Sequence, residues 1–140
     1  METTQKSRGH RNCNPLNVKI SNNNWKGKIK GSDKTFETFS SCYYGYRAAF
    51  ICLRHHFFNG HRSISSLINK WAPCSENQTN RYVDYVSKSM QVNQDIEINW
   101  NAETVYRLMF FMCIYENGYF FEDRALAEVI QKNINIQNNA

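Results

Sequence analysis

The sequence predicts a mainly helical α+β domain, with about five helices and a small antiparallel sheet of two or three strands near the N-terminus. Before residue 40, short segments of alternating apolar and polar residues are separated by Asn- and Gly-rich turns, as in β-strands. After residue 40, apolar residues recur every three or four positions, which is the helical period. The 140 residues, 41% of them hydrophobic, suffice for one domain with a core. We expect a single domain over residues 1–140, flexible at residues 1–9 and 133–140.

The expected strands lie in the first third of the chain. Residues 16–20 (LNVKI) and 25–30 (WKGKIK) form the first two, and residues 35–39 (TFETF) offer a third. The turns between them are residues 21–24 (SNNN) and 31–33 (GSD). A sheet this small is not stable alone, so we expect it to pack against the helices.

Five helices follow from the apolar pattern. Gly60 and Pro73 are expected to end the first two, and the third is expected to open near Asn77 or Thr79. The apolar stripes cover residues 46–57, 64–71, 82–90, 105–113 and 126–130.

The net charge of +5 favours an anionic partner such as nucleic acid, a membrane surface or a polyanionic cell wall. The basic residues are scattered without a run of five like charges, so a soluble protein with a modest positive surplus fits equally well. The polar start lacks the apolar segment of a signal peptide, and no apolar run is long enough to span a bilayer. We therefore expect synthesis in the cytoplasm without a signal peptide, and no membrane insertion.

The cysteines and histidines do not indicate a metal centre. The cysteines form neither a CxxC pair nor a Cys/His zinc spacing, and a disulfide framework is not expected. His55 and His56 are adjacent on one helix, so they cannot face one ligand together. We expect no metal and no other cofactor. The five cysteines are Cys13, Cys42, Cys52, Cys74 and Cys113.

Glu116 is the most informative polar residue, because it shares the apolar face of a helix. It lies eleven positions after Val105, which at ~100° per residue returns it to within about 20° of the same direction. Asn117 and Gly118 should end the helix, with the glycine in the left-handed conformation. Burial and the negative end of the helix dipole would both raise the pKa of the Glu116 carboxyl, as a general acid requires. Alternatively, the side chain turns out of the last turn and pairs with a surface cation.

Four stretches, taken in order, resemble small phage structural proteins linked to peptidoglycan hydrolysis, a family similar to lysozyme-like glucosaminidases and lytic transglycosylases. In those enzymes the glutamate helix comes early and a hairpin follows. Here the hairpin comes first, so the resemblance implies a circularly permuted lysozyme-like domain. The stretches are residues 8–27 (RGHRNCNPLNVKISNNNWKG), 36–50 (FETFSSCYYGYRAAF), 64–86 (ISSLINKWAPCSENQTNRYVDYV) and 108–121 (LMFFMCIYENGYFF).

The resemblance implies that Glu116 is the general acid and that Tyr82 faces it across the cleft. Asn14 keeps its match in the loop RNCNPLN and is expected to bind substrate. Cys13 and Leu16 depart from the pattern, which has Asn and Gly there. Leucine does not readily take a positive φ, so the departure at Leu16 bears on the geometry of this loop.

A second carboxylate would complete a glycosidase site, about 5–5.5 Å away in a retaining enzyme and ~6.5–9.5 Å away in an inverting one. Glu37, or Asp33, could supply it from the sheet, although a strand residue in solvent is the simpler interpretation of Glu37. Glu76 resembles an acidic position of the family, but a helix cap explains it as well. Lytic transglycosylases work with one acid.

Aromatic residues make up 14% of the chain, and sugar rings stack on aromatic faces. Trp25 and Tyr119 are therefore candidate substrate-binding walls, whereas Trp71 continues a helical stripe and is expected in the core.

Three functions compete. The first is an enzyme that cuts peptidoglycan glycan strands between N-acetylmuramic acid and N-acetylglucosamine, at the wall or from a phage particle, by a hydrolytic or a lytic route. The second is an inactive module of the same fold that serves as a virion part or a wall anchor. The third is a nucleic-acid binder, which the charge alone suggests, because no helix clusters Arg or Lys for recognition.

Overall fold

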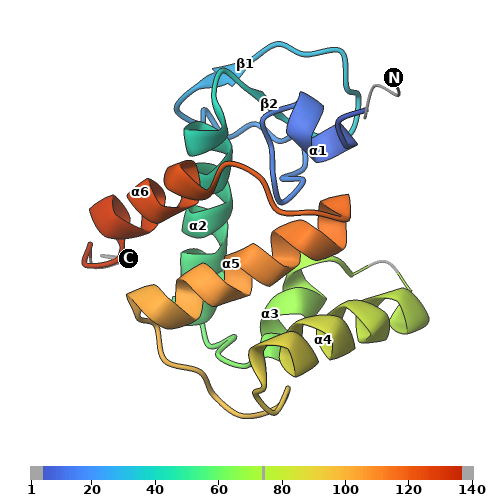
Figure 1. The fold of residues 1–140 in the computed structure, drawn as a ribbon, viewed down its shortest axis with the longest axis vertical. Helices are drawn as coiled ribbons and strands as arrows, with labels where there is room; N and C mark the ends of the chain where they lie inside the picture. The colour runs from blue at the N-terminus through green and yellow to red at the C-terminus, as the bar shows by residue number, and fades with distance from the viewer. Residues whose placement is uncertain (1–4, 74, 137–140) are drawn as a thin grey trace.

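The computed structural model describes residues 5–73 and 75–136, and it confirms a mainly helical domain with a small antiparallel sheet. Figure 1 shows helix α5 crossing in front of α2, with α3 and α4 on one side of it and α1 with the sheet on the other. Helix α6 packs along α2. The larger helices are α2 (Cys42–Phe58), α3 (Ile64–Trp71), α4 (Glu76–Met90), α5 (Ala102–Asn117) and α6 (Asp123–Asn133).

The sheet is smaller than the sequence suggests. Strand β1 (Lys28–Ile29) pairs antiparallel with β2 (Thr38–Phe39). The expected strand over residues 16–20 is reduced to one bridge, between Lys19 and Phe36. Its start cannot be extended because Asn17 has a φ of 55°, in the left-handed region.

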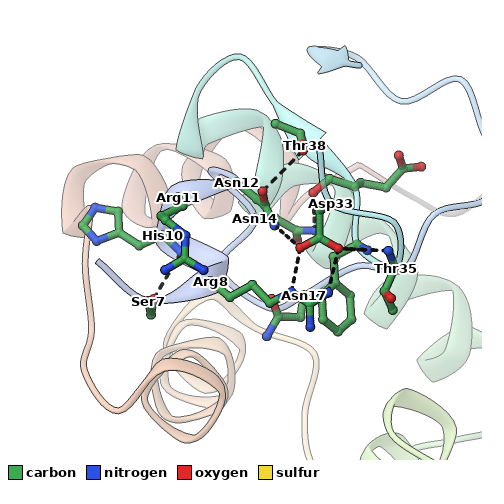
Figure 2. A network of polar contacts seen from close by, with 12 residues as sticks. Ser7, Arg8, His10, Arg11, Asn12, Asn14, Asn17, Asp33, Thr35 and Thr38 are labelled. Atoms are coloured by element: carbon green, nitrogen blue, oxygen red, sulfur yellow. Dashed lines mark hydrogen bonds and ion pairs between the residues drawn. The ribbon is translucent and has the colours of Figure 1, made fainter. Parts of the chain in front are cut away.

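A short helix, α1 (Arg8–Arg11), occupies part of the segment expected to be flexible. The Ser7 hydroxyl caps it by accepting from the backbone N–H of His10 at 3.2 Å. Asp33 fixes this helix to the sheet loop, because both of its oxygens accept from the Arg8 guanidinium, at 2.6 and 2.8 Å (Figure 2). Asp33 also accepts from the Asn12 amide at 3.0 Å. Arg8 and Asp33 thereby hold residues 7–11 in place.

Polar caps determine where the helices begin. Ser63, Ser75 and Asn101 each precede a helix, and each side-chain oxygen accepts from a backbone N–H three residues on. The cap of α4 is therefore Ser75 rather than Glu76, whose side chain lies outside the described part of the structure. At the other end of α5, Gly118 has a φ of 84°, which confirms the expected glycine stop.

The core is one cluster to which the five larger helices all contribute, and it holds the expected apolar stripes. Trp71 differs from expectation, because it is only partly buried at the edge of this core. The described cysteines are free thiols, and Cys74 lies outside the described residues. Within residues 5–73 and 75–136, no helix is both long and apolar enough to cross a membrane. Fully buried core side chains include Tyr46, Phe50, Leu53, Leu108, Met109 and Met112.

Candidate active site

Glu116 lies in the last turn of α5 and lines a pocket. A hydrogen bond connects it to the lining of a second pocket, and we call the two pockets together the groove. The first, which we call the acid pocket, has a volume of about 410 Å³ and is lined by Glu116, Tyr82, Tyr115, Arg81, Gln78 and Ala72. The second, the basic pocket, has a volume of about 230 Å³ and lies against the N-terminal loop. The Asn17 amide joins the two, because it lines the basic pocket and donates to Glu116 Oε1 at 2.9 Å. The basic pocket is lined by Asn17, Val18, Lys19, Ser21, Asn23, Trp25, Cys52, His56, Lys70 and Trp71.

The surroundings of Glu116 favour its protonated form. Burial is the largest influence, and it raises the pKa of the Glu116 carboxyl above the ordinary value. The hydrogen bond from Asn17, the Tyr82 hydroxyl and the charge of Lys19 oppose this rise, but they do not cancel it. A carboxyl that still holds its proton closer to neutral pH, at the wall of an open pocket, can donate that proton to a bound molecule.

Tyr82 lines the acid pocket together with Glu116. Its side chain is 3% exposed, and its ring stacks on Tyr115 with centroids 4.1 Å apart. Burial, and after it the neighbouring charge of Glu116, raise the pKa of the Tyr82 hydroxyl. Among the described residues this buried hydroxyl has no hydrogen-bond partner of good geometry. The Tyr82 hydroxyl therefore lies close enough to Glu116 to influence it, without forming a hydrogen bond of good geometry.

Glu37 is separate from this groove. It is 3% exposed, so the interpretation as a solvated strand residue is wrong. Its carboxylate lies 3.1 Å from the Lys28 ammonium and accepts from the backbone N–H of Ser21 at 3.3 Å. Glu37 lines a different pocket, beside the sheet, together with Lys28 and Asp33. The structure therefore does not bring Glu37 into either pocket beside Glu116.

Asn14 is positioned to hold the loop rather than to contact a ligand. It is fully buried, and its amide donates to the carbonyls of Val18 and Glu37, both at 2.9 Å. Its oxygen accepts from the backbone N–H of Val18 at 2.8 Å. Because both amide hydrogens are used and the residue is fully buried, Asn14 has no exposed group to offer to a substrate.

The two aromatic residues expected to bind substrate, Trp25 and Tyr119, lie in different surroundings. Trp25 lines the basic pocket, and its buried indole N–H has no partner among the described residues. Tyr119 lines neither pocket. Its hydroxyl lies 2.7 Å from Nδ1 of His10 and accepts from the backbone N–H of Ser7 at 3.1 Å, so it binds α1 to the end of α5.

The loop RNCNPLN takes a different geometry from the one that its departures suggested. Positive φ values occur at Cys13 (50°) and Asn17 (55°), whereas Leu16 has none and is fully buried. Leu16 therefore carries no backbone strain there. Asn17, which sequence reasoning missed, tolerates the left-handed region better than most residues. Trp71 was also missed as a groove residue; its indole N–H donates to the Leu16 carbonyl at 3.2 Å.

The groove shows no arrangement typical of a metal centre. Within the described residues, no three His, Cys, Asp or Glu side chains are placed to hold a metal ion. His56 lines the basic pocket with its ring centroid 5.7 Å from that of His55.

Fold and site together define a small, mainly helical domain that carries a partly buried glutamate in a groove. No known family model matches the chain. The sequence is 33% identical to Protein P5 of Pseudoalteromonas phage PM2 over 122 residues, which cover 84% of this chain and 75% of the phage protein. The chain belongs to the family of this phage protein.

Proposed function

We propose that this protein cleaves the glycan strands of peptidoglycan, with Glu116 as the general acid. The observation that carries the proposal is a carboxyl with a raised pKa at the wall of an open groove, hydrogen-bonded to Asn17 and next to Tyr82. Glu116 would give its proton to the glycosidic oxygen while the bond from that oxygen to the anomeric carbon breaks. A positive net charge suits an anionic wall.

The groove favours a one-acid route. Among the described residues that line its two pockets, Glu116 is the one carboxylate, because Glu37 is paired with Lys28 elsewhere. In the lytic reaction the ionised Glu116 would take the proton from the sugar's own 6-hydroxyl. That oxygen then bonds to the anomeric carbon and forms an anhydro end. We therefore propose lytic cleavage rather than hydrolysis, in a circularly permuted lysozyme-like domain.

The membership in a phage protein family supports the setting of this proposal. We infer that the protein acts on the host cell wall, from a phage particle or after release from the cell. Peptidoglycan strands are the partner that the groove and the charge suggest.

The test is digestion of purified peptidoglycan, followed by mass spectrometry of the released fragments. We expect anhydro-muropeptides from the wild type, and a loss of ~10²–10⁴ in rate for Glu116→Gln. Glu97→Gln is the matched control, since Glu97 is exposed and lines neither pocket. Fragments with reducing ends would show hydrolysis instead, and equal rates for the two variants would refute the role of Glu116.

A second function is favoured by the same lack of a second acid. An inactive module of this fold would bind wall glycans as a virion part or an anchor. Sedimentation with peptidoglycan without released fragments, by the wild type as well as by Glu116→Gln, would support this module and reject the enzyme.

A further inference from the structure

The basic pocket carries positive charge that nothing described on its walls neutralises. Lys19, His56 and Lys70 contribute to its lining, and its described lining residues include no carboxylate. Neither lysine lies within 4 Å of a described acidic oxygen, whereas Lys28, on the sheet, is paired with Glu37. Two ammonium groups around one small concave surface create a local positive potential.

A second observation is independent of this charge. The buried indole N–H of Trp25 and the buried Oδ1 of Asn17 both lack a hydrogen-bond partner among the described residues, and both side chains line the basic pocket. Buried polar groups in folded proteins are nearly always paired, so two orphaned groups in the lining of one pocket call for a partner, such as a water or a bound molecule. The Trp25 N–H would pair with an acceptor oxygen on a bound molecule.

The protonation state of His56 is compatible with a ligand site in the basic pocket. Burial is the largest cause that lowers the pKa of His56, and the charges of His55, His61 and Lys70 lower it further. The imidazole is therefore held neutral beside the lysines, where it can donate or accept a hydrogen bond.

We propose that the basic pocket is a subsite for a carboxylate carried by the glycan strand, next to the bond that Glu116 cleaves. Lys19 and Lys70 supply the attraction, and the Trp25 indole supplies a hydrogen bond. The inference rests on the proposed function, to which it adds a substrate preference. Strands of N-acetylglucosamine alone are neutral and offer no such group. Peptidoglycan offers two sources, the lactyl group of the muramic acid and the acidic residues of the stem peptide.

The experiment measures binding to the Glu116→Gln protein, so that no probe is consumed. Three tetrasaccharide probes separate the sources: a neutral chito-oligosaccharide, a peptide-free muramyl glycan with free lactyl carboxylates, and the same glycan with its stem peptides. We expect the neutral probe to bind at least ~10-fold more weakly than the better anionic probe, and added salt to reduce the difference. The better anionic probe identifies the source of the carboxylate.

Lysine variants locate the effect. Lys19→Gln and Lys70→Gln should each weaken the better anionic probe by ~5-fold and leave the neutral probe unchanged. Lys132→Gln is the matched control, because it removes one charge from α6, which lines neither pocket. Circular dichroism of each variant verifies the fold.

Equal affinity for all three probes would overturn the subsite, as would a loss in the lysine variants that is the same for neutral and anionic probes. Absence of binding to any probe would overturn it too. A different result would reject the proposed function and leave the subsite intact. In that case the wild type would release no fragments, while Glu116→Gln would still prefer an anionic probe. Cleavage of peptidoglycan without any preference for anionic probes would agree with the proposed enzyme and reject the subsite.

Discussion

Replacing Glu116 by glutamine should stabilise the protein at neutral pH, although it removes the acid. Gln retains an Oε1 acceptor for the Asn17 amide, which lies 2.9 Å from that atom in the wild type. It lacks the charge whose burial raises the pKa of the Glu116 carboxyl. The substitution therefore removes the free-energy cost of burying the charge and keeps the hydrogen bond from Asn17.

The sign and size of this effect follow from the linkage between protonation and folding. A carboxyl whose pKa is raised in the folded state binds its proton more tightly there than in the unfolded chain. It therefore lowers the free energy of unfolding as the pH rises from the unfolded pKa, near 4.5, through the folded pKa. Each unit of difference corresponds to about 1.4 kcal/mol, and 1 kcal/mol shifts the melting temperature of a domain this size by ~3 °C.

Thermal unfolding followed by circular dichroism at pH 4 and pH 7.5 tests this reasoning. The Glu116→Gln protein should melt a few degrees above the wild type at pH 7.5, and the difference should shrink toward zero at pH 4. Glu97→Gln, on an exposed side chain, should show no such dependence. A lower melting temperature for Glu116→Gln at pH 7.5 would refute the argument, because it would mean that Asn17 and Lys19 stabilise the ionised form more than burial opposes it.

Three further predictions concern the loop and the groove. Gly9→Ala should destabilise the protein by about 1–3 kcal/mol in denaturant unfolding. The reason is that a Cβ at this position would lie 2.5 Å from Oδ1 of Asn117 and 2.8 Å from the Asn14 carbonyl oxygen. An unchanged midpoint of unfolding would contradict this close approach. Asn14→Ala should cost about 2–4 kcal/mol by the same measurement, since three buried hydrogen bonds disappear, and a cost below 1 kcal/mol would count against a structural role. Tyr82→Phe should leave the melting temperature within about 2 °C, because its hydroxyl makes no hydrogen bond of good geometry, yet reduce peptidoglycan clearing if that group acts with Glu116. Full clearing would exclude such an action.

The helices could be predicted from the sequence because their signals are local. The apolar stripes, and Gly118 after α5, each act within a few residues of the element that they define. The small sheet was overestimated because alternation over five residues also fits an irregular loop whose direction changes at Asn17.

The site was only partly predictable, because its contacts join distant parts of the chain. The raised pKa of Glu116 could be expected from its place on an apolar helix face. Its partner Asn17 lies 99 positions away, and no periodic pattern connects the two. Glu37 shows the same limit, since its ion pair is with Lys28 of strand β1, and the alternation of residues along one segment does not reveal such a partner.

The docking of the N-terminal segment on the end of α5 determines when the groove can exist. The Asn117 amide donates to the Pro15 carbonyl at 2.7 Å, and its oxygen accepts from the Ser7 hydroxyl at 2.7 Å, so these contacts attach the N-terminal segment to the end of α5 that carries Glu116. A growing chain that has left the ribosome only as far as α4 contains the loop but not the acid. The groove can therefore assemble only after α5 has been synthesised, and shortened products that stop before α5 lack Glu116.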